Sequence, residues 1–163
     1  MRNFIFILLI FICPFASFGQ SETIQELHKK YDDAFVMFFY KNTLNMLNMQ
    51  DSKEFEALIN GIDKMKLLRI NKTDNDFTKD QYKQLVKDYR SEDFEELMSV
   101  RQQEMNINAY IKESGGKTKG IVILLNEAEN LTVLDIKGSI PLDKIGELAK
   151  YADEFSDSKL NFD

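Results

Sequence analysis

Residues 113–120, ESGGKTKG, contain the Gly-Lys-Thr triplet that ends many phosphate-binding loops. The usual loop has the pattern G-x-x-x-x-G-K-[ST] and lies between a strand and a helix. Counting back from Gly116, the first glycine should stand at position 111, where the chain has Ile111. The residues after Thr118, KGIVILL, predict a strand, so no helix N-terminus faces a phosphate there. The stretch is therefore predicted to be a hairpin turn, and no nucleotide or other cofactor is expected.

Paired carboxylates are the second kind of chemistry that the sequence offers. Glycoside hydrolases, for example, use two of them as acid and base. The candidates are Glu127, Glu129 and Asp135. Glu127 and Glu129 lie in NEAEN, which is typical of a solvated turn between two strands.

Asp135 lies inside LTVLDIKG, a predicted strand. If Thr132, Leu134 and Ile136 face the core, Asp135 faces water on the same side as Leu131 and Val133. Two apolar side chains on that side leave three options: a covering helix, a partner, or an ordinary mixed surface.

Nucleophilic and zinc chemistry lack their usual residues. The chain has one histidine, His28, and one cysteine, Cys13, and no G-x-S-x-G motif. Zinc sites draw on several His or Cys ligands, and a serine triad would have to recruit His28. We expect no metal site, no catalytic residue, and a surface or boundary position for His28.

A calcium loop is also excluded. NKTDNDFTKD spaces its acidic residues like an EF-hand, which requires Gly at its sixth position and Glu at its twelfth. Counting from Asp74, these positions hold Lys79 and Leu85. The stretch is predicted to be a polar loop that ends in a helix cap.

The N-terminus has the layout of a secretory signal peptide. A positive residue precedes an apolar run, which is followed by small residues that predict cleavage between Gly19 and Gln20. The apolar run is too short to span a bilayer. Lipid anchoring at Cys13 is disfavoured, because Ile12 stands where lipoprotein signals have a small residue. We expect an exported protein, periplasmic or extracellular.

Charge narrows the choice of partners. The chain has 21 Lys and Arg against 27 Asp and Glu, a net charge of −6, and loss of Arg2 with the signal would make it −7. Such a balance argues against nucleic acid and against anionic lipid as partners. Because Cys13 would be lost as well, the mature chain would have no cysteine, and its core alone would carry the fold.

Apolar spacing predicts one domain over residues 20–156, after a signal at 1–19 and before a polar tail at 157–163. Thr23 and Thr78 each begin a capping box. The predicted helices cover 23–31, 42–61, 78–89 and 94–103, and one more begins at Pro141 with Ile145, Leu148, Ala149, Ala152 and Phe155 on one side. The predicted strands cover 34–41, 62–70, 105–111, 120–127 and 131–138.

These elements indicate an α+β fold with a single mixed sheet of about five strands covered by helices. The strand at 34–41 is apolar at nearly every position, which predicts a central position in the sheet. A helical crossover would join it to the strand at 62–70. The last three strands would form an antiparallel meander. A ferredoxin-like connectivity is the neighbouring option.

The chain resembles the domain of unknown function 4252 family, small exported or lipid-anchored bacterial proteins. The resemblance lies in the signal followed by a short helix, and in the segments FEELMSV, INAYIKE and LDIKGSIPLDKIGELAK. It covers most of the mature chain but departs from the lipid-anchored members by lacking a good acylation site. The family implies no activity, so it assigns no functional residue.

We therefore expect a non-enzymatic binding or interaction module of the bacterial cell envelope, with an unknown protein or small ligand as its partner. A carboxylate-based hydrolase and a regulatory component of envelope signalling are the alternatives. Two neighbouring buried carboxylates in a cleft would favour the hydrolase, whereas an exposed apolar patch would favour binding.

Overall fold

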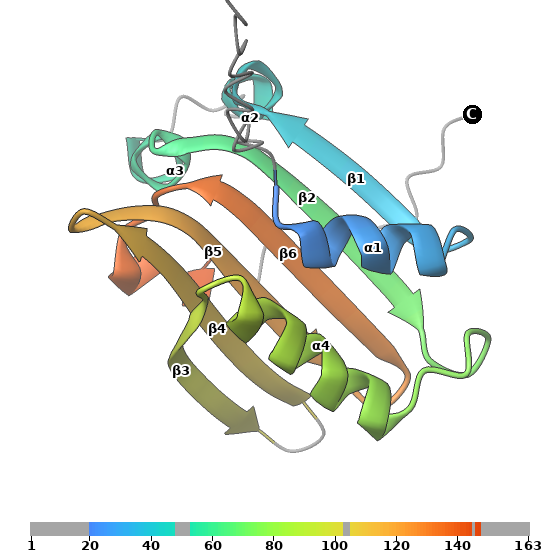
Figure 1. Cartoon of the computed structure of the whole chain (residues 1–163). Coiled ribbons are helices and arrows are strands. Elements are labelled where there is room, and N and C mark those ends of the chain that lie inside the picture. Colours follow the sequence, from blue (N-terminus) through green and yellow to red (C-terminus); the bar gives the residue numbers. More distant parts are fainter. Residues whose placement is uncertain (1–19, 48–52, 103–104, 145, 148–163) are drawn as a thin grey trace, which may run out of the picture.

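The protein folds around a single antiparallel sheet of six strands, in the order β1-β2-β6-β5-β4-β3, as the computed structural model shows (Figure 1). The structure describes residues 20–47, 53–102, 105–144 and 146–147. The strands are β1 (Phe35–Tyr40), β2 (Ile62–Asn71), β3 (Glu95–Gln102), β4 (Met105–Ser114), β5 (Lys117–Asn126) and β6 (Asn130–Gly138). The helices are α1 (Glu22–Lys30), α2 (Lys41–Leu47), α3 (Lys53–Ile59), α4 (Lys79–Ser91) and the 3-10 turn η1 (Leu142–Lys144).

The predicted C-terminal meander is confirmed. Strands β4, β5 and β6 pair antiparallel in sequence order. The turn between β4 and β5 is formed by Gly115 and Gly116, whose φ angles of 60° and 70° are those that glycine adopts without strain. The turn between β5 and β6 is closed by a hydrogen bond from the Glu127 amide to the Asn130 carbonyl at 3.0 Å.

The predicted helix over 94–103 is wrong, because β3 occupies this stretch and pairs with β4. Phe94, Leu97 and Met98 have helical spacing, but the register shifts between Glu96 and Met98, where the strand bulges. A bulge places consecutive side chains on one face, and Leu97 and Met98 both pack against the same core cluster. The bulge therefore imitates a helical pattern in the sequence.

The predicted crossover between the first two strands is also wrong, because β1 and β2 pair antiparallel, with Phe35 opposite Arg69 and Tyr40 opposite Lys64. Helices α2 and α3 have seven residues each, or about 10 Å, while a six-residue strand spans about 20 Å. Neither helix is long enough to carry the chain back along the strand. Strand β1 consequently lies at the edge of the sheet and not at its centre.

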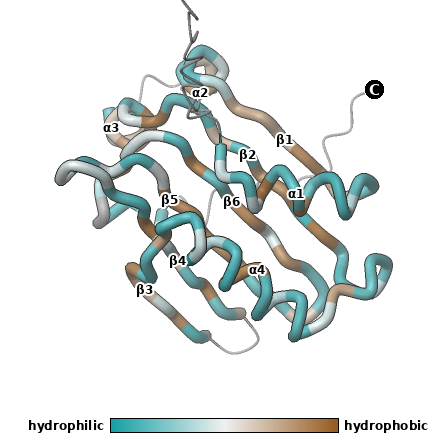
Figure 2. Tube along the Cα trace, in the orientation of Figure 1, coloured by the Kyte–Doolittle hydropathy of each residue, from teal (hydrophilic) through white to brown (hydrophobic). Residues whose placement is uncertain are grey.

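The sheet has a core on each face. One face packs against α1 and α4 (Figure 1), with Ile24 and Tyr89 fully buried between helices and sheet. The other face packs against Leu44 of α2 and against Leu58 and Ile59 of α3. Strands β5 and β6 are buried on both faces, which accounts for their apolar sequences, coloured brown in Figure 2.

Of the two capping boxes predicted at helix starts, one is confirmed and the other helix begins earlier than predicted. The capping box predicted at Thr78 is confirmed, because Thr78 and Gln81 each accept a backbone hydrogen bond from the other. Helix α1 begins earlier than predicted, since its N-cap is Ser21 and not Thr23. Beyond Pro141, η1 and helical residues 146–147 are seen, while Ile145, Leu148, Ala149, Ala152 and Phe155 of the predicted last helix lie outside the described residues.

Candidate functional site

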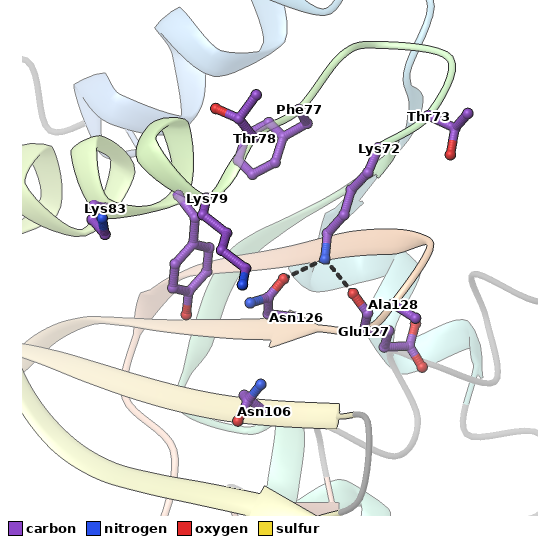
Figure 3. A pocket seen from close by; sticks show the side chains of 11 residues that line it. Lys72, Thr73, Phe77, Thr78, Lys79, Lys83, Asn106, Asn126, Glu127 and Ala128 are labelled. Carbon is purple, nitrogen blue, oxygen red and sulfur yellow. Dashed lines mark hydrogen bonds between the residues drawn. The ribbon is translucent and has the colours of Figure 1, made fainter.

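A cavity of about 590 Å³ lies where the start of α4, the loop after β2 and the β5–β6 turn meet (Figure 3). We call it the lysine cavity, and define it by Lys72, Lys79, Tyr82, Asn106 and Asn126, which lie on its wall. These residues come from the β2–α4 loop, from the first turn of α4, and from β4 and β5.

Lys72 fastens the β5–β6 turn to the loop after β2. Its Nζ donates to Asn126 Oδ1 at 2.6 Å and to the carbonyl oxygen of Glu127, and its backbone amide donates to the Glu129 carbonyl at 2.8 Å. Burial lowers the pKa of Lys72, and the nearby Glu127 carboxylate acts in the opposite direction. The partly buried ammonium group of Lys72 is thus held in place at the cavity wall.

Lys79 brings a second positive charge to the same cavity. It is the first residue of α4, and Figure 3 shows its ammonium group pointing toward the amide of Asn126. The N-terminal end of a helix is the positive end of its dipole, so it adds to the attraction for a negative group. Lys83, one turn later, forms an ion pair with Asp80 at 2.8 Å.

Polar and aromatic groups complete the wall. Arg101 Nε donates to Asn106 Oδ1 at 2.9 Å, and Figure 3 shows the amide nitrogen of Asn106 directed toward Asn126. Tyr82 donates its hydroxyl hydrogen to Asn108 Oδ1 at 2.9 Å. Burial raises the pKa of Tyr82 well above its usual value, so the phenol stays neutral. The cavity lining thus includes three lysines, of which Lys83 is paired with Asp80, and one acidic residue, Glu127. With the amide N–H donors and the aromatic surface, this set is suited to an anionic group.

A second polar cluster lies at the N-terminus of α1, on the face of the sheet that α1 and α4 cover. Ser21 donates its hydroxyl hydrogen to Asp135 Oδ2 and accepts the Ile24 amide at 3.3 Å. Glu92 accepts the amides of Glu22 at 2.9 Å and Thr23 at 2.6 Å. The two carboxylates thus hold the first turn of α1, where its dipole favours negative charge.

Asp135 is only 2% exposed, which corrects the prediction that it faces water. It shares its face of the sheet with Leu131 and Val133, and that face is the one that α1 and α4 cover. The pKa of Asp135 is raised to about 6: burial is the largest cause, the Ser21 hydrogen bond acts in the opposite direction, and the Glu92 charge adds to the rise.

Lys66 lies opposite Asp135 in the β2–β6 register and is 3% exposed. Its Nζ lies 3.1 Å from His28 Nδ1 and 3.4 Å from the Ile24 carbonyl oxygen, to which it donates. Burial lowers the pKa values of Lys66 and of His28, and the Lys66 charge lowers that of His28 further. His28 therefore lies at the boundary of the α1 core, as a neutral neighbour of Lys66.

The structure does not bring the three predicted carboxylates together. Asn126 pairs with Leu131, whereas Val122 pairs with Asp135, so Asp135 lies four residues, or about 13 Å, along β6 from the turn that holds Glu127 and Glu129. The carboxylate near Asp135 is Glu92, which no sequence motif marks and which only the closure of the fold places there.

The sequence analysis also missed Lys72 and Lys79. The available signal was the polar loop NKTDNDFTKD, which has a lysine near each end and a helix cap between them. The side chain of Asn71 shapes this loop by accepting the amides of Thr73 at 3.0 Å and Asp74 at 3.2 Å.

The remaining predicted sites are not tested by the described residues. Within that part of the chain, no three His, Cys, Asp or Glu side chains are grouped to hold a metal ion. Cys13 and Gly19 lie outside the described residues, and Gln20, on the other side of the predicted cleavage point, is the first residue described. None of the helices in the described ranges has the length and apolarity needed to cross a membrane.

Comparison with known proteins gives one match. Neither the curated proteins nor the solved structures contain a match to the chain. The model of a domain of unknown function, DUF4252, matches residues 28–148, which include β1 to β6, α4 and the lysine cavity. This match covers most of the 163 residues, and the chain therefore belongs to the DUF4252 family.

Proposed function

We propose that the protein is an exported, non-enzymatic binding module of the bacterial cell envelope, which holds the carboxylate or phosphate group of a small ligand in the lysine cavity. One observation carries the proposal: the ammonium groups of Lys72 and Lys79 line the same cavity of about 590 Å³ as the amides of Asn106 and Asn126. Phe77 and Tyr82 give this cavity an apolar wall for the rest of the ligand.

The charge of the whole chain makes this cavity distinctive. The protein has a net charge of −6, so its overall charge repels an anion. Lys72 and Lys79 place positive charge at one point of this negatively charged protein. An anion between them would also favour the charged form of Lys72, whose pKa burial lowers.

The test is a titration of the 15N-labelled protein with inorganic phosphate and, separately, with acetate, followed by NMR. We expect saturable shifts of the amides around Lys72, Lys79 and Asn126. Lys79→Met should weaken binding at least about tenfold, the cost of one charge-assisted contact. Lys87→Met is the matched control, because Lys87 is an exposed lysine on α4 that does not line the cavity. Equal affinities for the two variants, or the absence of saturable shifts in the parent protein, would contradict the proposal.

A carboxylate-based hydrolase is the second candidate. It is favoured by the observation that Asp135 and Glu92 line one cavity of about 670 Å³ and that the pKa of Asp135 is raised to about 6. Both carboxylates, however, already accept hydrogen bonds that hold α1. Hydrolysis of a glycoside or ester by the parent protein that is lost in both Asp135→Asn and Glu92→Gln, with the fold retained, would favour this candidate over the first.

A further inference from the structure

Strand β1 is an edge strand with an unusually apolar sequence. In the described part of the chain it pairs only with β2, and its six residues, FVMFFY, include no charged side chain and no proline. Phe35 is 40% exposed, Phe38 48% and Tyr40 59%. Three large aromatic side chains therefore meet solvent along one margin of the sheet, where Figure 2 shows β1 in brown.

The opposite margin carries the protections that sheet edges normally have. Strand β3 has Glu95, Glu96 and Arg101 along its length and a bulge between Glu96 and Met98. Charges and bulges prevent an edge from pairing with another strand. Strand β1 has neither, since its register with β2 continues without a shift from Phe35 to Tyr40. The difference between the two edges indicates that β1 is an edge that receives a partner strand.

The charges that flank β1 point to its partner. Asp33 lies in the turn two residues before the strand, and Lys41 follows the strand as the first residue of α2, where its Nζ donates to the Asn60 carbonyl oxygen at 3.5 Å. Both side chains are exposed. In an antiparallel pair of two β1 strands centred on Met37, the start of each strand lies beside the end of the other. Lys41, at the beginning of α2, therefore comes near Asp33 of the second copy, so opposite charges meet at both ends. Phe38 then lies beside Val36 of the second copy, on the same face of the joined sheet. A twofold axis perpendicular to the sheet generates this arrangement and closes the assembly at two copies.

We propose that β1 pairs antiparallel with β1 of a second copy of this chain, which joins the two sheets into one and forms a homodimer. The occupant is a second copy because the strand and its flanking charges are complementary to themselves. The dimer does not depend on the lysine cavity, because the residues that line the cavity come from α4, β4, β5 and the adjoining loops and not from β1.

The length of the strand limits the strength of this contact. A six-residue strand spans about 20 Å, so the interface belongs to the small class of protein interfaces. We expect a reversible dimer with a dissociation constant in about the micromolar range.

The test is sedimentation velocity and equilibrium of the protein, expressed from its full chain and purified, over concentrations from about 1 to 500 μM. The parent should change from monomer to dimer across this range. Asp33→Lys and Lys41→Asp each place like charges near one another at both ends of the pair, and each should weaken the dimer at least tenfold. The double variant Asp33→Lys with Lys41→Asp exchanges the two charges and should restore the parent affinity.

Lys87→Asp on α4 makes the same charge change as Lys41→Asp away from β1, and it should leave the dimer unaffected. Circular dichroism of each variant reports whether the fold is retained, which is expected because the changed residues are exposed. A monomer throughout the concentration range would overturn the proposal. It would also be overturned by a dimer that tolerates both single changes, because such a dimer would use another surface.

Discussion

A carboxylate buried in a sheet lowers stability unless its charge is compensated, and Asp135 is compensated only in part. It accepts a hydrogen bond from Ser21 and lies opposite Lys66, but Glu92 and the buried phenol of Tyr89 lie nearby and add no positive charge. Burial therefore dominates and raises the pKa of Asp135 to about 6, above the value of 3.8 for the unfolded chain. Between pH 3.8 and about pH 6, the native state therefore keeps a proton on Asp135 that the unfolded state has released.

The pH dependence of stability follows from this shift. A raised carboxyl pKa contributes stability that is fully present below about pH 4 and is lost as the pH rises through about 6. A shift of this size corresponds to about 2–3 kcal/mol. Asp135→Asn keeps an acceptor for Ser21 and has no charge to lose. We expect its free energy of unfolding to rise relative to the parent by about 2 kcal/mol between pH 4 and pH 7.5. Urea unfolding at both pH values measures this, and a constant difference between the two proteins would contradict the assigned role of Asp135.

At the scale of elements, α1 is held to the fold by groups that lie far away in sequence. Glu92 caps its first turn from the end of α4, 70 residues from Glu22. Since two N-terminal amides share one carboxylate, removing that carboxylate leaves both without their partner.

Glu92→Ala should destabilise the protein by about 1–2 kcal/mol, the usual cost of losing a helix cap. Its first effect should be local, with faster hydrogen exchange of the α1 amides than of those in α4. Glu95→Ala, an exposed change three residues later, serves as the control and should leave α1 exchange unchanged. If α1 in Glu92→Ala exchanged as in the control, Glu92 would not be the cap that holds this helix.

The elements also show how far the sequence predicts the fold. Local signals succeeded where one motif determines the backbone, as in the Gly115–Gly116 turn and the Thr78 capping box. They failed where tertiary contacts determine the type of an element or its position in the sheet. Around β3, the residues Phe94, Leu97 and Met98 have the spacing of a helix face, although the chain forms a bulged strand there. The apolar sequence of β1 predicts a central strand, although β1 lies at the edge of the sheet.

The candidate site was harder to predict than the fold for the same reason. The family was predicted from the resemblance of several segments of the chain. Lys72, Lys79 and Asn106, in contrast, meet only when three separate segments fold together. Asp135 was singled out from the sequence, yet its environment was predicted wrongly because it depends on which face α1 and α4 cover. Residue type alone does not carry that information.

At the scale of the whole molecule, export with cleavage of the predicted signal would leave a mature chain without cysteine. The one cysteine, Cys13, precedes the predicted cleavage point between Gly19 and Gln20. The structure begins its described fold at Gln20, one residue before the Ser21 cap, so cleavage there would leave α1 and its cap intact. Stability of the exported chain would then be independent of redox conditions.

Expression of the full chain in a bacterium, followed by intact-mass analysis of the periplasmic fraction, tests this prediction. We expect the mass of residues 20–163 and a thermal midpoint that a reducing agent does not change. Gly19→Tyr should block cleavage, because the position before the cut requires a small residue, whereas Phe18→Tyr should be processed normally. Recovery of a chain that retains Cys13, or equal processing of the two variants, would place the cut elsewhere and remove the basis for a cysteine-free exported module.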